Sequence, residues 1–217
     1  MNKKKIAFFV GFFVLLFVGF YFVMMKLEPG LKTPQPLNYI PPFAFPNQEG
    51  KIITDKDVAG DVYVVEYFFT TCKGICPKLN VNMKKVAEDF AGEPNFRILS
   101  FTVDPGTDSV ARMKHYADSL GADPKRWWFL TGRKDSLYLL ARNGYHVDDQ
   151  KNNPLNIGEQ FLHTQLFALV DKNGRLRKIY DGLKKDELQE MEEDITGLLK
   201  ENPSAPRFAN SLFTNNP

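Results

Sequence analysis

Cysteine is scarce in this sequence. Only Cys72 and Cys76 occur among the 217 residues, and they are four positions apart. A small domain held together by disulfides would need several cysteine pairs along the chain, and structural zinc usually takes four ligands, often from two such pairs. Neither pattern is present. We therefore interpret the two cysteines as one local chemical site and not as part of a scaffold.

A strong net charge, internal repeats and low-complexity segments are also missing. The formal charge of +2 is too small to indicate nucleic-acid binding, and no stretch interleaves basic with aromatic residues. We therefore exclude a nucleic-acid partner. The composition, 43% hydrophobic and 25% charged, is that of an ordinary globular protein. A chain of 217 residues predicts one domain with appendages.

The N-terminal segment has no charged residue between positions 6 and 25. A helix of this length spans the ~30 Å hydrocarbon layer of a membrane. A cleaved signal peptide would have a shorter apolar core and a small-x-small cleavage site, and this sequence has neither that site nor a cysteine for lipid attachment. We predict an uncleaved anchor over residues 1–26, made of a cytoplasmic stub and one transmembrane helix.

The residues that flank this apolar segment predict the orientation of the chain. Lys3, Lys4 and Lys5 precede it, and basic residues tend to stay on the cytoplasmic side. We expect the remaining chain on the periplasmic, extracytoplasmic side of the inner membrane, where the oxidising environment permits a disulfide. Five prolines predict a stiff, extended spacer over residues 27–42, and residues 201–217 predict a C-terminal tail.

Residues 43–200 alternate between strand and helix patterns, beginning with a β-hairpin signal and closing with a second hairpin signal followed by a helix. The expected strands are 43–45, 51–54, 62–69, 96–103, 127–130, 164–170 and 175–180, and the expected helices are 77–90, 109–120, 134–143 and 186–199. Thr107, Asp108 or Ser109 is the candidate N-cap of the second helix. Such alternation gives a largely parallel sheet covered on both faces. The predicted fold class is α/β, a thioredoxin-like three-layer sandwich with an N-terminal β-hairpin.

The two cysteines lie where the buried strand 62–69 gives way to a helix. If this turn is helical or nearly so, both sulfur atoms of Cys72 and Cys76 point the same way and can share one ion or one disulfide. Pro77 suits a first helical turn, and the helix N-terminus and Lys73 favour thiolate over thiol. Thiolates are soft ligands that select copper(I) over hard cations.

One imidazole can complete a two-thiolate site, and the sequence has three histidines. His115 lies among charged residues of the expected helix 109–120, which is typical of a solvated face. His146 lies in a polar loop and is a minor candidate. His163 precedes the expected strand 164–170, whose entry faces the cysteine loop in a thioredoxin-like sheet, so it is the main candidate. A hydrogen-bonded structural histidine is the alternative.

The cysteine motif resembles the Cys-x-x-x-Cys-Pro motif of the Sco/SenC family. Further matching segments follow in the family's order and spacing from about residue 40 to 200. The matching segments are Thr-Cys-Lys-Gly-Ile-Cys-Pro at 71–77, Ser-Phe-Thr-Val-Asp-Pro at 100–105, Trp-Phe-Leu-Thr-Gly at 128–132, and His163 ahead of Leu-Val-Asp at 169–171. Asp104, in the second of these segments, is expected either to shape the loop near the site or to cap the turn that follows it, and the capping role is favoured.

The resemblance implies a thioredoxin-like fold, copper bound by Cys72, Cys76 and His163, and assembly of the CuA centre of cytochrome c oxidase. The implied partners are the subunit II-type CuA domain of the oxidase and an upstream copper donor or thiol reductant. The resulting hypothesis is a membrane-anchored copper metallochaperone that carries Cu(I) or Cu(II). The sequence departs from the family at Lys73, where Pro is frequent, and at Leu162, where Asp is frequent.

Other functions would use the same cysteines. A thiol–disulfide reductase that prepares the cysteines of a partner needs Cys72 and Cys76 but does not need His163. A copper or redox sensor would bind the ion only to signal, and nothing in the sequence separates a sensor from a carrier. A peroxiredoxin is a weaker alternative, because its Thr-x-x-Cys signature requires Thr at the position of Phe69.

Overall fold

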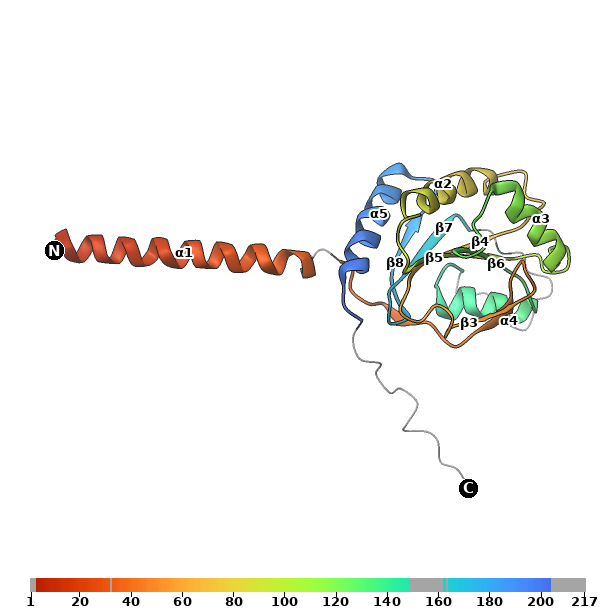
Figure 1. The fold of residues 1–217 in the computed structure, drawn as a ribbon, viewed down its shortest axis with the longest axis horizontal. Coiled ribbons are helices and arrows are strands. Elements are labelled where there is room, and N and C mark those ends of the chain that lie inside the picture. Colours follow the sequence, from red (N-terminus) through yellow and green to blue (C-terminus); the bar gives the residue numbers. More distant parts are fainter. Residues whose placement is uncertain (1–2, 32, 149–161, 163, 204–217) are drawn as a thin grey trace, which may run out of the picture. The chain divides into compact units, whose positions relative to one another are not determined.

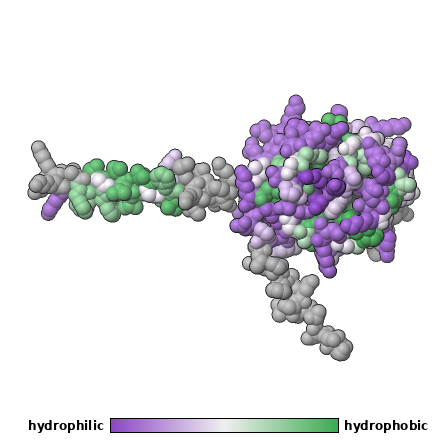
Figure 2. All heavy atoms as spheres, viewed as in Figure 1, coloured by the Kyte–Doolittle hydropathy of each residue, from purple (hydrophilic) through white to green (hydrophobic). Residues whose placement is uncertain are grey.

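Two units make up the chain, Met1–Pro34 and Gln35–Pro217. The structure, a computed structural model, describes residues 3–31, 33–148, 162 and 164–203. The first unit contains a single helix, α1 (Lys3–Leu31), whose middle part exposes large apolar side chains (Figure 2). Within the part of the chain that the structure describes, no helix meets both the length and the apolarity needed to cross a membrane.

Secondary structure extends into the segment that the sequence predicted as an extended spacer. α1 continues to Leu31, and Asn38–Tyr39 form the short strand β1. β1 pairs with the edge of the main sheet, where Asn38 lies opposite Leu176. This strand forms because an unpaired edge of β8 (Arg175–Asp181) lies beside it. The sequence prediction of a spacer did not foresee either element.

The second unit is built on a mixed six-stranded sheet in the order β1-β8-β7-β4-β5-β6 (Figure 1). Its longer strands are β4 (Val62–Phe68), β5 (Phe96–Thr102), β6 (Trp127–Leu130), β7 (Leu166–Val170) and β8 (Arg175–Asp181). β4, β5 and β6 are parallel, whereas β7 and β8 form an antiparallel hairpin beside β4. Every residue of β4 is buried, as expected for a strand covered on both faces.

Helices cover both faces of this sheet, which gives three layers (Figure 1). One face carries α2 (Cys76–Asp89), α3 (Val110–Leu120) and α5 (Lys185–Lys200), and the other carries α4 (Lys134–Leu139) and the hairpin of β2 (Ala44–Pro46) and β3 (Ile52–Thr54). Alternate residues of β4 supply the two cores, with Val62 and Val64 on the α2 side and Tyr63 and Val65 on the hairpin side. The predicted three-layer α/β sandwich with an N-terminal hairpin is confirmed.

One predicted helix differs from the structure in its last turn. The sequence predicted a continuous helix over residues 134–143, but α4 ends at Leu139 and a π-helical turn, η1 (Leu140–Gly144), follows. Its hydrogen bond runs from the N–H of Tyr145 to the carbonyl of Leu140. A Cβ atom at Gly144 would lie 2.9 Å from a methyl group of Leu140 and 3.1 Å from the ring of Pro41. Glycine is therefore required by close packing at this position.

Candidate thiol and metal site

The cysteine loop, which we define as residues 69–75, lies at the carboxyl end of β4 and leads directly into α2. In open α/β sheets this edge is where ligand sites form. α2 begins with Cys76 and has Pro77 in its first turn, as the sequence predicted, and its N-cap residue Ile75 provides no side-chain hydrogen bond. Both cysteines are free thiols. The structure therefore brings the predicted pair together at the start of a helix.

The two thiols differ in exposure and acidity. Cys72 is half-buried, whereas Cys76 is buried. Burial raises the pKa of Cys76 to about 12, and its hydrogen bond with Cys72 and the charges of Cys72 and Glu66 act in the same direction. Burial also opposes ionisation of Cys72, but hydrogen bonds from the Cys76 thiol and from the N–H groups of residues 74–76 outweigh it and lower the pKa of Cys72. Cys72 is therefore the thiolate-forming member of the pair.

This asymmetry predicts the order in which the thiols react. We expect iodoacetamide to modify Cys72 at least about tenfold faster than Cys76 in the reduced, metal-free protein. The thiolate is the reactive form of cysteine, and Cys76 is buried. Trypsin cleavage after Lys73 places the two cysteines in different peptides, so mass spectrometry can quantify each label separately. Equal labelling of both peptides at short times would contradict the assignment.

A carboxyl group is buried in the sheet beneath α2. Glu66, in the middle of β4, is 1% exposed and accepts a hydrogen bond from Ser100 Oγ (2.5 Å), which in turn accepts one from Trp127 Nε1 (2.7 Å). Among the described residues, the second carboxyl oxygen of Glu66 has no hydrogen-bond partner. Burial raises the pKa of Glu66 to about 7, although the hydrogen bond from Ser100 opposes the shift.

The raised pKa of Glu66 makes stability depend on pH. Below about pH 4.5 the carboxyl is neutral in both folded and unfolded states, whereas above about pH 7 the folded state must hold a buried charge. A shift of this size destabilises the wild type by about 3 kcal/mol at high pH. We therefore expect Glu66→Gln to gain about 3 kcal/mol over the wild type in unfolding free energy between pH 4.5 and pH 8. Urea denaturation of both proteins at the two pH values measures this difference, and a pH-independent difference would refute it.

His163, the predicted third ligand, lies outside the described residues, so its position stays a prediction. Its two neighbours along the chain are described. Leu162 is buried, and its N–H donates to Tyr138 Oη (3.1 Å). Leu162 and Thr164 line the same narrow crevice as Cys76. The chain on either side of His163 therefore passes beside the buried thiol.

The two other histidines have different surroundings. His115 is exposed on α3, as predicted for a solvated face. The Nε2 atom of His146 lies 2.9 Å from the amide nitrogen of Asn38, so this ring belongs to the contact between the η1 region and β1. Among the described residues, no three His, Cys, Asp or Glu side chains gather closely enough to hold a metal ion.

The buried carboxylate of Asp108 fixes the start of the cysteine loop. From the sequence, Asp108 was predicted only as a candidate helix cap. The Asp108 side chain is fully buried and accepts hydrogen bonds from the N–H (3.2 Å) and hydroxyl (2.5 Å) of Thr70 and from the hydroxyl of Thr102 (2.6 Å). The N-cap of α3 is Ser109. The main-chain carbonyl of Asp104 accepts hydrogen bonds from the N–H groups of Thr107 (3.0 Å) and Asp108 (2.9 Å), and capping by its side chain stays a prediction. The sequence signal that could have indicated the role of Asp108 is an acidic residue shortly after β5, the strand that pairs with β4.

Comparison with known proteins decides the family. The SCO1/SenC family model matches residues 32–200 of this chain. The chain belongs to the SCO1/SenC family. It is 30% identical over 184 residues to the SCO1 protein homolog of Bacillus subtilis (strain 168), with 83% of this chain and 93% of that protein covered. The family resemblance drawn from the cysteine motif is thus confirmed.

Solved Sco structures share the fold described above. BsSco, a member of the Sco family of cytochrome c oxidase assembly proteins in which a disulfide switch was identified, is 29% identical with a TM-score of 0.66, covering 77% of this chain and 98% of its own. Copper-bound ScoI of Bradyrhizobium japonicum is 23% identical with a TM-score of 0.58, covering 74% of this chain and 99% of its own, and shows likeness of fold. The thioredoxin-like Sco fold predicted from sequence is confirmed.

Proposed function

We propose that this SCO1/SenC protein is a copper metallochaperone that binds copper through Cys72, Cys76 and His163 and delivers it to the CuA site of cytochrome c oxidase. The observation that carries the proposal is the pair of free thiols, one half-buried and one buried, that the cysteine loop brings together at the carboxyl end of β4. The related BsSco belongs to a family of cytochrome c oxidase assembly proteins, and ScoI of Bradyrhizobium japonicum has been solved with copper bound.

The chemistry of the thiol pair suits copper(I) as cargo. Thiolates are soft ligands and select this ion over hard cations. The cysteine loop holds Cys72 and Cys76 together at the start of α2, so both sulfur atoms can share one ion. Binding then releases protons, and affinity rises with pH. A third ligand from His163 leaves a coordination position open, through which an acceptor thiolate can attack and take the ion.

Transfer of copper from this protein to an acceptor tests the proposal. We expect the copper-loaded protein to pass copper to a reduced, metal-free CuA domain of oxidase subunit II, followed by the appearance of the CuA absorption bands. If the reduced CuA domain gains no copper, while the disulfide of a separately oxidised CuA domain is reduced by this protein, the metallochaperone proposal fails and the reductase is favoured.

The reductase is the second candidate because one observation favours it. In thiol–disulfide exchange, an accessible thiol of low pKa attacks and a second thiol resolves the mixed disulfide. Cys72 is half-buried with a lowered pKa, whereas Cys76 is buried with a raised one. This asymmetry meets the requirement of a reductase without any contribution from His163.

We further propose that residues 6–25 anchor the protein in the inner membrane, with the second unit on the extracytoplasmic side. The support is the run without charges, its inclusion in one helix, α1, and the exposure of large apolar side chains such as Phe12, Leu15 and Phe17. Lys3, Lys4 and Lys5 support a cytoplasmic N-terminus. Extraction of membranes at alkaline pH tests this proposal, because a processed, freely soluble protein would overturn it.

A further inference from the structure

A hydrogen-bonded relay holds Arg112 of α3 beside the cysteine loop. Nε of Arg112 donates to Thr70 Oγ1 (2.7 Å), and that hydroxyl donates to Asp108 Oδ1 (2.5 Å). Nε also lies 3.8 Å from Asp108 Oδ1. Asp108 is fully buried and Thr70 precedes Cys72 by two residues. The guanidinium is therefore held, through a hydroxyl of the cysteine loop, to a fully buried and hydrogen-bonded carboxylate.

The rest of the Arg112 head group faces solvent. Its side chain is 47% exposed, and its Nη1 and Nη2 atoms have no acceptor among the residues that the structure describes. A guanidinium whose Nε is engaged still presents these two nitrogens as a fork, which matches the two oxygens of a carboxylate. Arg112 thus combines a fixed orientation with an unused pair of donors.

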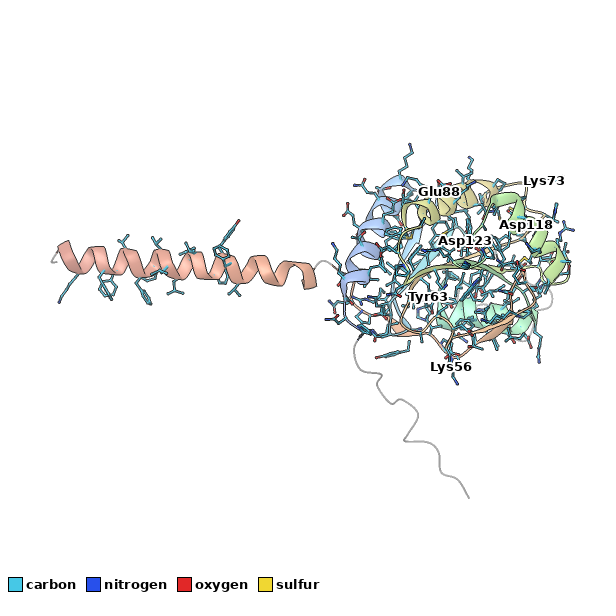
Figure 3. All side chains as sticks on the ribbon, viewed as in Figure 1. Lys56, Tyr63, Lys73, Glu88, Asp118 and Asp123 are labelled. Atoms are coloured by element: carbon cyan, nitrogen blue, oxygen red, sulfur yellow. The ribbon has the colours of Figure 1, made fainter. Side chains whose placement is uncertain are left out.

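Two lysines extend the positive charge around the thiols. Lys73, between the cysteines, and Lys78, in the first turn of α2, are both exposed (Figure 3 labels Lys73), and neither has an ion-pair partner among the described residues. By contrast, Lys85 and Lys114, elsewhere on α2 and α3, each pair with two carboxylates. In the described part of the chain, Lys73 and Lys78 thus keep unpaired positive charge beside the thiols, whereas Lys85 and Lys114 are neutralised.

Among the described residues, the carboxylates of this region cancel only part of that charge. Asp108 is buried, pairs with Arg112 (3.8 Å) and accepts hydrogen bonds from Thr70 and Thr102. It therefore does not offset the charges of the two lysines. Asp104 is half-buried. The positive charge of this region comes from Arg112, from the exposed lysines of the cysteine loop and α2, and from the positive ends of the α2 and α3 dipoles. The rim of the thiol site is therefore a place where an anionic surface is favoured.

We propose that Arg112 is the docking point for a carboxylate on the protein that exchanges copper or thiols with Cys72, and that Lys73 and Lys78 widen this docking surface for an acidic partner. The inference rests on the proposed function, since only a partner that brings its own thiols to Cys72 has reason to dock here. Because Thr70 and Asp108 fix the guanidinium in advance, little side-chain entropy is lost on docking.

Charges at the rim of an interface act mainly on the association rate and its salt dependence. The test therefore follows the rate of thiol exchange with two matched probes. Each probe is a disulfide-linked peptide dimer, with three Glu beside its cysteine in one and three Lys in the other. The Cys72 thiolate attacks the probe disulfide and releases one peptide thiolate. Cys76 then loses its proton and attacks Cys72, which releases the second peptide thiol and leaves the Cys72–Cys76 disulfide.

The measurement uses the reduced full-length protein in a non-ionic detergent, at low and at high salt. At low salt, Arg112→Gln should slow the reaction with the Glu probe about threefold to tenfold and should not slow the reaction with the Lys probe. Arg112→Glu should reverse the preference between the probes. Both effects should vanish at about 0.5 M salt, where exposed charges are screened.

Lys56→Gln is the matched control, because Lys56 is exposed without an ion-pair partner in the described part of the chain and lies across the unit from Lys73 in Figure 3. It should leave both rates unchanged. Equal slowing of both probes by Arg112→Gln would mean that Arg112 only positions the loop, and no slowing would mean that it has no role, so either result overturns the proposal. Copper(I) affinity, measured separately, reports on the proposed function and should be unchanged in Arg112→Gln.

Discussion

Oxidation of Cys72 and Cys76 to a disulfide should abolish copper(I) binding, and reduction should restore it. A disulfide has no thiolate to offer, so two of the three proposed ligands are lost at once. Even the loss of one supporting residue typically weakens a metal site about 10–100-fold, so a larger loss is expected here. Competition with a copper(I) chelator, on the oxidised and the reduced protein, measures the two affinities.

The structure explains why this switch should be reversible. The two thiols lie on one short loop at the start of α2 and are close enough to shift each other's pKa, so a disulfide would join neighbouring groups. Cys76→Ser provides the control, because it removes one ligand and the disulfide together and should bind copper(I) weakly in both redox conditions. Equal copper(I) affinity of the oxidised and reduced wild type would place the ligands elsewhere in the chain.

Local patterns were sufficient to predict the sheet core and the cysteine site. The run of Val, Tyr and Phe over residues 62–69 predicted a strand buried on both faces, and β4 is such a strand. The end of this strand is followed closely in sequence by the two cysteines, four positions apart, and by the start of a helix. Since these features depend on residues that are neighbours along the chain, they could be predicted without knowing the tertiary structure.

The features that the sequence did not predict depend on pairing between distant segments. Glu66 reaches Ser100 because β4 and β5 pair in the register that places these residues opposite each other. Asp108 reaches Thr70 across the same two strands. β1 is a strand only because β8 offers an edge. None of these registers follows from a local pattern, so Glu66 had no assigned role before the fold was known and Asp108 was assigned only as a candidate helix cap.

His163→Ala should separate a copper carrier from a reductase. If His163 is the third ligand, its removal should weaken copper binding by at least about 10–100-fold, which even the loss of a supporting residue typically produces. The loss should be largest for copper(II), which prefers nitrogen to an all-sulfur site. Disulfide reduction should stay largely intact, because thiolate attack depends on the acidity and access of the cysteines. Copper titrations in both oxidation states and an insulin-reduction assay measure the two activities.

The described neighbours of His163 make this substitution informative. Leu162 and Thr164 line the crevice beside Cys76, and Ala at position 163 leaves both side chains in place. His115→Ala is the matched control, because His115 is exposed on α3. His146→Ala tests the minor candidate, although it also removes a contact with Asn38. If His163→Ala binds both copper states as the wild type does and still supports oxidase maturation, His163 is not a ligand, and the half-buried thiolate of Cys72 with its buried partner is best explained as a reductase site.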